Sequence, residues 1–450
     1  MTRAIIVRHG QSTYNIEKRI QGRTDFSRLT QKGCDDASQV GKFLSQIKFD
    51  AIYCSPLTRA QQTAAIIHQE LSVNSEQSAV PQPSHQLLEV DLPLWEKMLS
   101  ADVQYQFADD YRIWKEKPHE FKMLVPDGDG TREHFPVLSL YAQAREFWQE
   151  ILSRHQGKTI LIVGHNGINR SLISTALNIP PSRYHSLQQS NCGVSVLNFS
   201  GALGEPAQLE SLNQTQHMGV TFPSLRPNHQ GLRLFLVRHG ETDWNRQGRY
   251  QGQTDVTLNQ QGTLQSQKLS DLMQNVELDL IVSSSMSRAK ETAEIILHHH
   301  PHVNLQLDDG FKEITHGFWE GKLETDIAQD FPEDFQQWLT KPAQLQLSSG
   351  ENLQKLWQRS VKIFDAIVEE ALSKKLKTIL VVAHGGINQV LVCHIMGLSP
   401  ENFWNFRQSN GSVSVIDYPL GLDGLPVLQA MNITSHIHGG AIDKTVTGAM

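Results

Sequence analysis

The stretch Ala4-Ile5-Ile6-Val7-Arg8-His9-Gly10 near the start of the chain returns as Leu234-Phe235-Leu236-Val237-Arg238-His239-Gly240. In both places an apolar run precedes Arg-His-Gly, and such a run is typical of a buried strand. Open α/β sheets present reactive groups where strands end, at the carboxyl edge of the sheet. Each stretch therefore predicts a buried strand that delivers an arginine and a histidine onto a turn loosened by glycine.

Further residues repeat downstream of both stretches in the same order. The matched pairs are Asn15 and Asn245, Gln21-Gly22 and Gln251-Gly252, Arg59 and Arg288, Glu89 and Glu313, and His165 and His384. The offset falls from 230 residues for His9 to 219 for His165, which indicates short deletions in loops. A period of this length indicates a duplicated domain rather than a solenoid.

Segments of two kinds alternate along both copies. The predicted strands are residues 4–7, 51–53, 159–163 and 194–197 in the first copy and 234–237, 280–282, 378–382 and 413–416 in the second. Predicted helices include residues 58–70, 141–153 and 167–177. Such alternation is typical of mostly parallel sheets between two helical layers. We expect two tandem three-layer α/β/α domains, residues 1–220 and 231–438, followed by a mobile tail at 439–450.

The composition fits soluble domains. The 450 residues are 39% hydrophobic and 19% charged, and the formal net charge of −7 gives no basic surface for nucleic acid. No apolar run reaches the roughly 18 residues of a membrane span, and few residues precede the first predicted strand, so we expect a cytoplasmic protein. The cysteines are not matched between the copies, which favours free thiols over disulfides or a metal site.

Each copy brings two arginines and two histidines to one predicted sheet edge, which makes a local cationic pocket whose natural guest is phosphate. The forked donors of Arg8 and Arg59 suit phosphate oxygens better than lysine would. His165 follows a second buried strand and precedes a helix, so we expect its side chain and the helix amides to meet the same anion. With no carboxylate cluster to hold a metal, side chains supply the positive charge and no cofactor is needed.

His9 is the candidate nucleophile. A neutral imidazole attacks phosphorus to give a phosphohistidine, which water then cleaves. The neighbouring arginines are expected to keep the pKa of His9 low and its ring unprotonated. Glu89 supplies the proton for the leaving group and afterwards activates the water. His239 and Glu313 hold the same positions in the second copy.

Together these residues resemble the histidine phosphatase superfamily, in its phosphoglycerate-mutase-like branch, across both copies. The resemblance rests on Arg-His-Gly, the mid-chain arginine within residues 55–64 and 284–293, the acidic glutamate and the late histidine. It implies His9 and His239 as nucleophiles and Glu89 and Glu313 as proton donors. It also implies a phosphate site made of Arg8, Asn15, Arg59 and His165 in the first copy and Arg238, Asn245, Arg288 and His384 in the second. Gln21, Gly22, Gln251 and Gly252 are further candidates for substrate binding.

The copies differ in the loops that flank the family's substrate pocket. The second has residues 317–321 and 349–351 in the family's form, whereas the first departs at 92–97 and 127–130. This predicts shared chemistry with different substrate preferences. In its segments 89–92 and 189–196 the first copy resembles the catalytic domain of plant 2-carboxyarabinitol-1-phosphate phosphatases, and two-domain relatives in cyanobacteria are associated with phosphoserine hydrolysis.

The leading hypothesis is a metal-independent phosphomonoesterase for a small phosphorylated carboxylic acid, with phosphoserine slightly favoured. A 2-carboxyarabinitol-1-phosphate phosphatase, a phosphoglycerate mutase and a phospholigand sensor without turnover remain alternatives. The expected partner is a small anionic phosphorylated metabolite. Neither nucleic acid nor membrane is expected as a partner, and a homodimer stays open.

Overall fold

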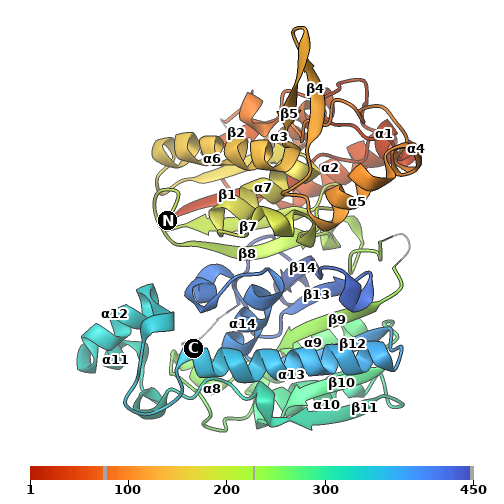
Figure 1. The fold of residues 1–450 in the computed structure, drawn as a ribbon. Helices are drawn as coiled ribbons and strands as arrows, with labels where there is room; N and C mark the ends of the chain where they lie inside the picture. Colours follow the sequence, from red (N-terminus) through yellow and green to blue (C-terminus); the bar gives the residue numbers. More distant parts are fainter. Residues whose placement is uncertain (74–78, 227–228, 446–450) are drawn as a thin grey trace. The chain divides into compact units, whose positions relative to one another are not determined.

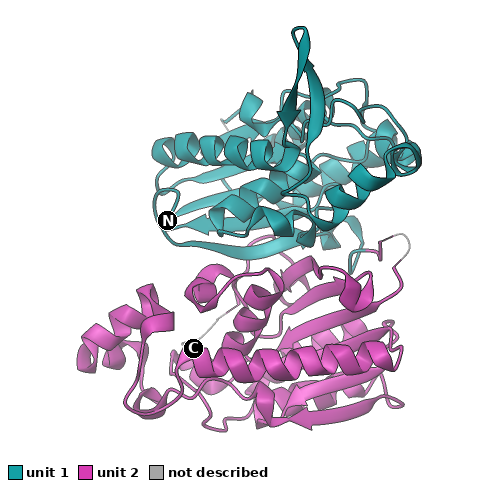
Figure 2. Cartoon of the chain, in the orientation of Figure 1, with its two compact units in different colours: residues 1–223 teal, residues 224–450 magenta. Residues whose placement is uncertain are grey.

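A computed structural model describes residues 1–73, 79–226 and 229–445. The chain forms two compact units, Met1–Pro223 and Ser224–Met450 (Figure 2). Each unit is an α/β structure with a mixed β-sheet and flanking helices (Figure 1). Every strand predicted from an apolar run is present in them.

The sheet of the first unit has the strand order β8-β7-β1-β6-β2-β3. The strands are β1 (Thr2–Arg8), β2 (Ala51–Cys54), β3 (Pro81–Pro83), β6 (Thr159–Gly164), β7 (Val194–Phe199) and β8 (Ala207–Gln214). The helices are α1 (Thr13–Glu17), α2 (Gln31–Phe43), α3 (Thr58–Val73), α4 (Ser100–Gln106), α5 (Ala108–Glu116), α6 (Pro136–Arg154) and α7 (Asn166–Ala176). A separate hairpin pairs β4 (Met123–Asp127) with β5 (Gly130–His134).

The direction in which the chain crosses this sheet determines its layers. From β1 it passes by way of α2 to β2 and by way of α3 to β3, then returns by way of α6 to β6 and on past β1. Parallel crossover connections are right-handed. The connections that lead from β1 towards β3 therefore place their helices on one face of the sheet, and the connection that leads back from β3 places its helix on the other face. In agreement, α2 packs against α3, and α6 packs against α7. β1 and β6 lie side by side, and the connections that follow them lead to opposite faces of the sheet. They therefore form a topological switch point.

The sheet is mixed, which corrects the prediction of a mostly parallel one. β1, β6, β2 and β3 run parallel to one another, but β7 is antiparallel to both β1 and β8. The loop after α7 explains the reversal. It returns to the carboxyl end of β1, where the Cys192 N–H donates to Arg8 O at 3.0 Å, so β7 begins there and runs back down the sheet.

The second unit repeats this arrangement, with the strand order β11-β10-β12-β9-β13-β14. Its strands are β9 (Leu232–Arg238), β10 (Leu280–Ser284), β11 (Asn304–Asp308), β12 (Thr378–Ala383), β13 (Val413–Tyr418) and β14 (Val427–Ile433). Its helices are α8 (Asp243–Gln247), α9 (Gln260–Met273), α10 (Ser287–Leu297), α11 (Glu324–Asp330), α12 (Pro332–Thr340), α13 (Leu353–Ser373), α14 (Gly385–Ile395) and α15 (Ser435–His438). Here too β13 is antiparallel to its neighbours β9 and β14.

The central strands form the core of each unit. Ala4, Ile5, Ile6 and Val7 are fully buried, as a strand covered by helices on both faces requires. The predicted free thiols are present: Cys34 is partly exposed, whereas Cys54, Cys192 and Cys393 are buried. No helix within the described ranges is both long and apolar enough to cross a membrane.

The end of the chain differs from the predicted mobile tail. Residues 439–445, called the C-terminal segment below, pack onto the second unit, and Ala441 and Thr445 are buried. An ion pair between Asp443 and Arg407 holds the segment in place. Residues 446–450 of the predicted tail lie outside the described part of the chain.

Candidate active sites at the carboxyl edges of the two sheets

The predicted histidines of the first unit meet at the ends of β1 and β6. Arg8 pairs with Gly164 in the parallel register, and the His9 N–H donates to Gly164 O at 2.9 Å. His165 follows directly after Gly164, so both histidines leave the sheet at the same edge. Their ring centroids lie 5.1 Å apart, with 61° between the ring planes.

A backbone carbonyl sets the tautomer of His9. Its Nδ1 lies 2.7 Å from Gly10 O, in a fully buried environment. Because a carbonyl oxygen only accepts hydrogen bonds, Nδ1 carries the proton and donates it. In the neutral ring the lone pair then resides on Nε2, which is the atom that a nucleophilic histidine needs.

Two arginines are held rigidly beside these histidines. Arg59 is buried on α3 and donates from Nη1 to Thr24 O at 3.1 Å and from Nη2 to Gly22 O at 3.0 Å. Arg8 donates from Nη1 to Gln189 O at 2.7 Å. These carbonyls use one side of each guanidinium and fix its orientation.

Several buried donors of this cluster have no protein partner. Among the described residues they include Arg8 Nε, Arg59 Nε and both ring nitrogens of His165. Buried polar atoms are normally paired, so a set of unpaired ones needs an explanation. Arg8 and Arg59 are close enough to His165 to lower its pKa, and two guanidinium groups and an imidazole together supply the kind of donors that a phosphate dianion requires.

A threonine links the helix of Arg59 to the turn of His9. Thr63 Oγ1 donates to Arg59 O at 2.8 Å and accepts from the Gly10 N–H at 3.0 Å. Gly10 has no space for a side chain, since a Cβ atom would lie 2.4 Å from Gly33 O. The turn after β1 is therefore fixed by α3 on one side and by α2 on the other.

Glu89 is buried at the start of α7. Its Oε2 accepts from the Gly167 N–H at 3.0 Å, and Oε1 accepts from the N–H groups of Ile168 at 3.2 Å and Val90 at 2.7 Å. This corrects the expectation that the amides of this helix would meet the phosphate. The favourable N-terminus of α7 is occupied by the Glu89 carboxylate, which the helix amides orient.

Asn15 and Gln21 support the turns around the histidine. Asn15 Oδ1 accepts from Ser12 N–H at 3.0 Å and from Asn191 Nδ2 at 3.2 Å. Gln21 Oε1 accepts from the Ser12 and Ser27 hydroxyls at 3.1 and 2.8 Å. Gly22, predicted to bind substrate, uses its carbonyl to hold Arg59 and has a positive φ of 50°.

Burial and nearby charges keep the His9 ring neutral. Burial is the main reason why the pKa of His9 lies well below its usual range, and Arg8 and Arg59 lower it further. Burial also lowers the pKa of both arginines, in each case to about 10, while Glu89 opposes the shift. Both arginines therefore stay charged at neutral pH. The expected low pKa of His9 is confirmed in direction, although burial contributes more than the arginines.

The second unit builds the same constellation. His239 Nδ1 donates to Gly240 O at 2.7 Å, and the ring centroids of His239 and His384 lie 5.1 Å apart, with 61° between the ring planes. Glu313 Oε2 accepts from the Gly386 N–H at 2.9 Å at the start of α14. The remaining polar contacts involve Arg238 Nη1 with Gln408 O at 2.6 Å, Arg288 Nη2 with Gly252 O at 2.8 Å and Thr242 Oγ1 with Gln251 Oε1 at 2.9 Å.

The sites differ in how the second histidine is held. In the second unit Arg288 Nε donates to His384 Nδ1 at 3.2 Å, and His384 Nε2 lies 2.8 Å from Ser284 Oγ. His384 thus carries its proton on Nε2, whereas His165 has neither contact. Asn245 Nδ2 is buried without a protein partner in the described structure, which leaves a donor for a ligand.

The divergent loops keep one common element. Glu96 in the first unit and Glu320 in the second accept from the backbone N–H of Arg23 and Gln253, at 2.5 and 3.1 Å. Both glutamates thereby hold the loop whose carbonyls position the helix arginine. Trp95 and Trp319 are buried and pack against other aromatic rings.

Sequence reasoning missed a charged group next to the Glu89 carboxylate. Arg170 is buried beside Tyr184 and Glu89, and both raise its pKa against the larger lowering by burial. The second unit has Gln389 and Phe403 at the matching positions. Comparison of the copies was the available signal, because only the first carries a charge there.

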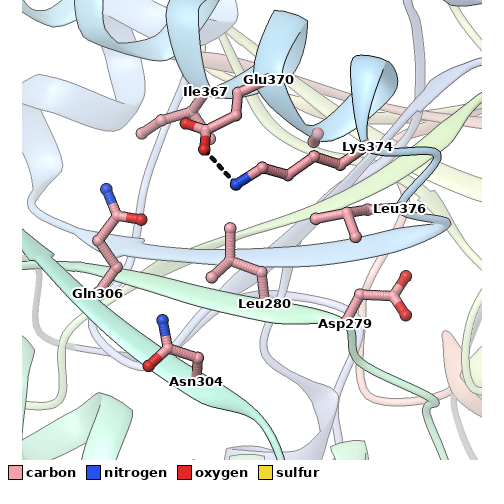
Figure 3. A pocket seen from close by; sticks show the side chains of 9 residues that line it. Asp279, Leu280, Asn304, Gln306, Ile367, Glu370, Lys374 and Leu376 are labelled. Atoms are coloured by element: carbon pink, nitrogen blue, oxygen red, sulfur yellow. Dashed lines mark hydrogen bonds and ion pairs between the residues drawn. The ribbon is translucent and has the colours of Figure 1, made fainter.

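Outside the two sites, the described part of the chain has no cluster of metal ligands but does have a cavity. Within the described ranges no three His, Cys, Asp or Glu side chains converge as a metal site would require. The second unit has a cavity of about 230 Å³ at the amino-terminal ends of β10 and β11, next to the Glu370–Lys374 ion pair (Figure 3). Since His239 follows the carboxyl end of β9, this cavity lies at the opposite edge of the same sheet.

Comparison with known proteins agrees with this geometry. The family model "Histidine phosphatase superfamily (branch 1)" matches residues 4–213 and again 234–434. A 2-carboxy-D-arabinitol-1-phosphatase of Triticum aestivum is 29% identical over 97% of this chain and 86% of its own length. A probable 2-carboxy-D-arabinitol-1-phosphatase of Arabidopsis thaliana is 31% identical over 98% and 89%. Phosphoserine phosphatase 1 of Hydrogenobacter thermophilus is 33% identical but covers 46% of this chain and 94% of its own.

Both halves of the chain therefore match one family, and each half contains the histidine pair, the arginines and the buried glutamate described above. The chain belongs to the histidine phosphatase superfamily, branch 1, and is a phosphomonoester hydrolase.

Proposed function

We propose that residues 1–220 and 231–438 are two catalytic domains that hydrolyse phosphomonoesters of small carboxylic acids through a phosphohistidine. The observation that carries this proposal is the buried His9 ring, protonated on Nδ1 and placed beside Arg8 and Arg59, whose buried Nε atoms have no protein partner among the described residues. His239 has the same Nδ1 contact. A nucleophile and a carboxylate retained in both domains argue against a sensor, because binding alone needs neither.

The first step forms a bond between His9 Nε2 and phosphorus while the ester P–O bond breaks. The leaving oxygen takes a proton from the Glu89 carboxylic acid, so the alcohol departs neutral. Arg8, Arg59 and His165 bind the phosphoryl oxygens, with Asn15 as a further ligand. Their charge compensates the charge that builds up on those oxygens.

In the second step Glu89 takes a proton from water. The hydroxide oxygen bonds to phosphorus, the P–N bond breaks, and its electron pair returns to Nε2. In the second domain His239, Glu313, Arg238, Arg288, His384 and Asn245 take the same roles. Gln21, Gly22, Gln251 and Gly252 serve as positioning residues of the loops that carry the arginines.

For the substrate we propose a sugar-acid phosphate of the 2-carboxyarabinitol 1-phosphate kind. The support is coverage, since the plant enzymes with that name align with both domains. Sequence reasoning slightly favoured phosphoserine, but the phosphoserine phosphatase aligns with less than half of the chain. Its higher identity over one domain keeps phosphoserine as the second candidate.

The test measures phosphate release from 2-carboxyarabinitol 1-phosphate, phosphoserine and 3-phosphoglycerate in the presence of a chelator. Wild type, His9→Ala, His239→Ala and the double variant are compared. We expect turnover by wild type, partial loss in at least one single variant and none in the double variant. Rapid quenching should trap an acid-labile phosphohistidine. Turnover by the double variant, or loss of wild-type turnover on chelation, would contradict the mechanism.

A further inference from the structure

The C-terminal segment places a carboxylate beside the second site. Asp443 Oδ2 lies 3.2 Å from Arg407 Nε and also accepts a hydrogen bond from the Ser409 hydroxyl. Its side chain is 2% exposed. Arg407 Nη2 donates to Thr445 O at 3.3 Å, and the Thr445 N–H donates to Asp443 Oδ1 at 2.9 Å. A guanidinium and a hydroxyl thus hold one buried carboxylate, and the backbone wraps around it.

This carboxylate lies next to the proposed phosphate site. Arg238 donates from Nη1 to the carbonyl of Gln408 at 2.6 Å, and Gln408 stands between the two residues that hold Asp443. Burial is the main cause that lowers the pKa of Arg238 to about 10; Arg407 lowers it further, whereas Asp443 opposes the shift. The segment's negative charge is therefore close enough to interact with a phosphate-binding arginine.

The first unit lacks this arrangement. At the positions of Arg407 and Ser409 it has Gln188 and Ser190. The Ser190 hydroxyl accepts from Asn213 Nδ2 at 3.2 Å, as the Ser409 hydroxyl does from Asn432 at 3.3 Å. The loop framework is thus shared, and the added charge belongs to the second unit.

We propose that Arg407 and Ser409 form a carboxylate subsite beside the phosphate site of the second unit, and that Asp443 occupies it as an internal stand-in for a substrate carboxylate. The inference rests on the proposed function, since it concerns phosphorylated carboxylic acids. A substrate with such a group must displace the C-terminal segment before it binds. The C-terminal segment consequently inhibits the turnover of such substrates by the second unit.

The test compares 3-phosphoglycerate with glycerol 3-phosphate, which differ at one end by carboxylate against hydroxymethyl. In a His9→Ala background, where only the second unit turns over, we expect Asp443→Asn or termination after Gly439 to raise kcat/KM for 3-phosphoglycerate. If the subsite is open about a tenth of the time, the rise is about tenfold. For glycerol 3-phosphate we expect less than a twofold change. Arg407→Gln should remove the preference for 3-phosphoglycerate in the shortened chain.

Two controls separate this effect from general disturbance. Asp443→Asn in a His239→Ala background reports on the first unit and should leave both rates unchanged. Asp330→Asn removes the surface ion pair with Lys322 and should leave the second unit unchanged. An equal rise for both esters, no rise, or a fall after termination would overturn the subsite.

A binding measurement covers the case in which turnover is absent. In the His9→Ala, His239→Ala double variant, trypsin cleavage after the exposed Lys444 is followed by mass spectrometry. We expect 3-phosphoglycerate to accelerate this cleavage and glycerol 3-phosphate to leave it unchanged, because only the former displaces Asp443. Wild type without turnover of any ester refutes the proposed function, whereas an unchanged cleavage rate refutes the subsite.

Discussion

Gly167 provides a sharp test of how the catalytic carboxylate is held. A Cβ atom at this position would lie 2.4 Å from Glu89 Oε1 and 2.5 Å from the Tyr184 hydroxyl oxygen, where ordinary contact begins at 3.4 Å. In Gly167→Ala the carboxylate must therefore retreat by about 1 Å from its present place. The φ angle of Gly167 is not in the left-handed region, so alanine at this position causes no backbone strain.

The expected loss follows from that displacement. A shift of about 1 Å costs on the order of 10²-fold in rate when reacting groups must be aligned, and proton transfer itself contributes about 10²- to 10⁴-fold. We expect kcat to fall about 10²-fold in a His239→Ala background, measured as phosphate release from the best ester. Helix propensity favours alanine over glycine by about 1 kcal/mol, so the variant should stay folded.

Ser153→Ala is the matched control, because its exposed hydroxyl lies near the C-terminus of α6, donates to Glu150 O and precedes the amino-terminal end of β6. It should leave kcat unchanged. In the second unit Gly386→Ala should repeat the loss, since its Cβ would lie 2.6 Å from Glu313 Oε1. A Gly167→Ala variant with kcat within threefold of its parent, and with a native circular dichroism spectrum, would refute the assignment of Glu89.

Further predictions concern the arginines, the threonine and pH. Arg59→Lys in the His239→Ala background should lower kcat/KM about 10²-fold by steady-state kinetics, because lysine has one nitrogen where the planar guanidinium has three and cannot present its donors as a fixed fork; an unchanged value would contradict the role of Arg59. Thr63→Val should lower kcat with little change in KM, since it leaves the Gly10 N–H without an acceptor, and Thr175→Val on α7 is a control outside the site. Burial lowers the pKa of His316 to about 4, so the unfolded chain gains a proton near pH 6.5 that the folded chain does not bind. The free energy of unfolding, measured with urea, should therefore fall by about 1 kcal/mol between pH 7.5 and 5.5 because of this residue. His316→Phe should remove that contribution. A variant whose free energy of unfolding changes with pH as much as that of wild type would contradict the prediction.

The parallel strands at the centre of each sheet were predictable because each of them is a run of consecutive apolar residues. The direction of β7 was not, because it depends on the return of the preceding loop to β1 through a backbone hydrogen bond. β8 was missed because Gln208, Glu210 and Asn213 interrupt its apolar pattern. The short edge strand β3 is Pro-Gln-Pro, a composition that argues against a strand.

The convergence of His9, Arg59 and His165 followed from strand ends and from duplication. The contacts that orient them did not, because Gly22, Gln189 and Thr24 act through carbonyl groups that every residue possesses. The contact between Asp443 and Arg407 joins residues that no repeat relates. Such contacts become visible only in the three-dimensional structure.

The hydrogen bond from His9 Nδ1 to the carbonyl of the very next residue means that the His9 ring is oriented within its own tripeptide. No distant acidic partner has to be inherited together with it. Surrounding loops are thereby free to be rebuilt for new substrates while the reactive nitrogen keeps its lone pair. The Arg-His-Gly tripeptide orients its own histidine, which helps to explain how one chain can contain it twice next to loops of different sequence.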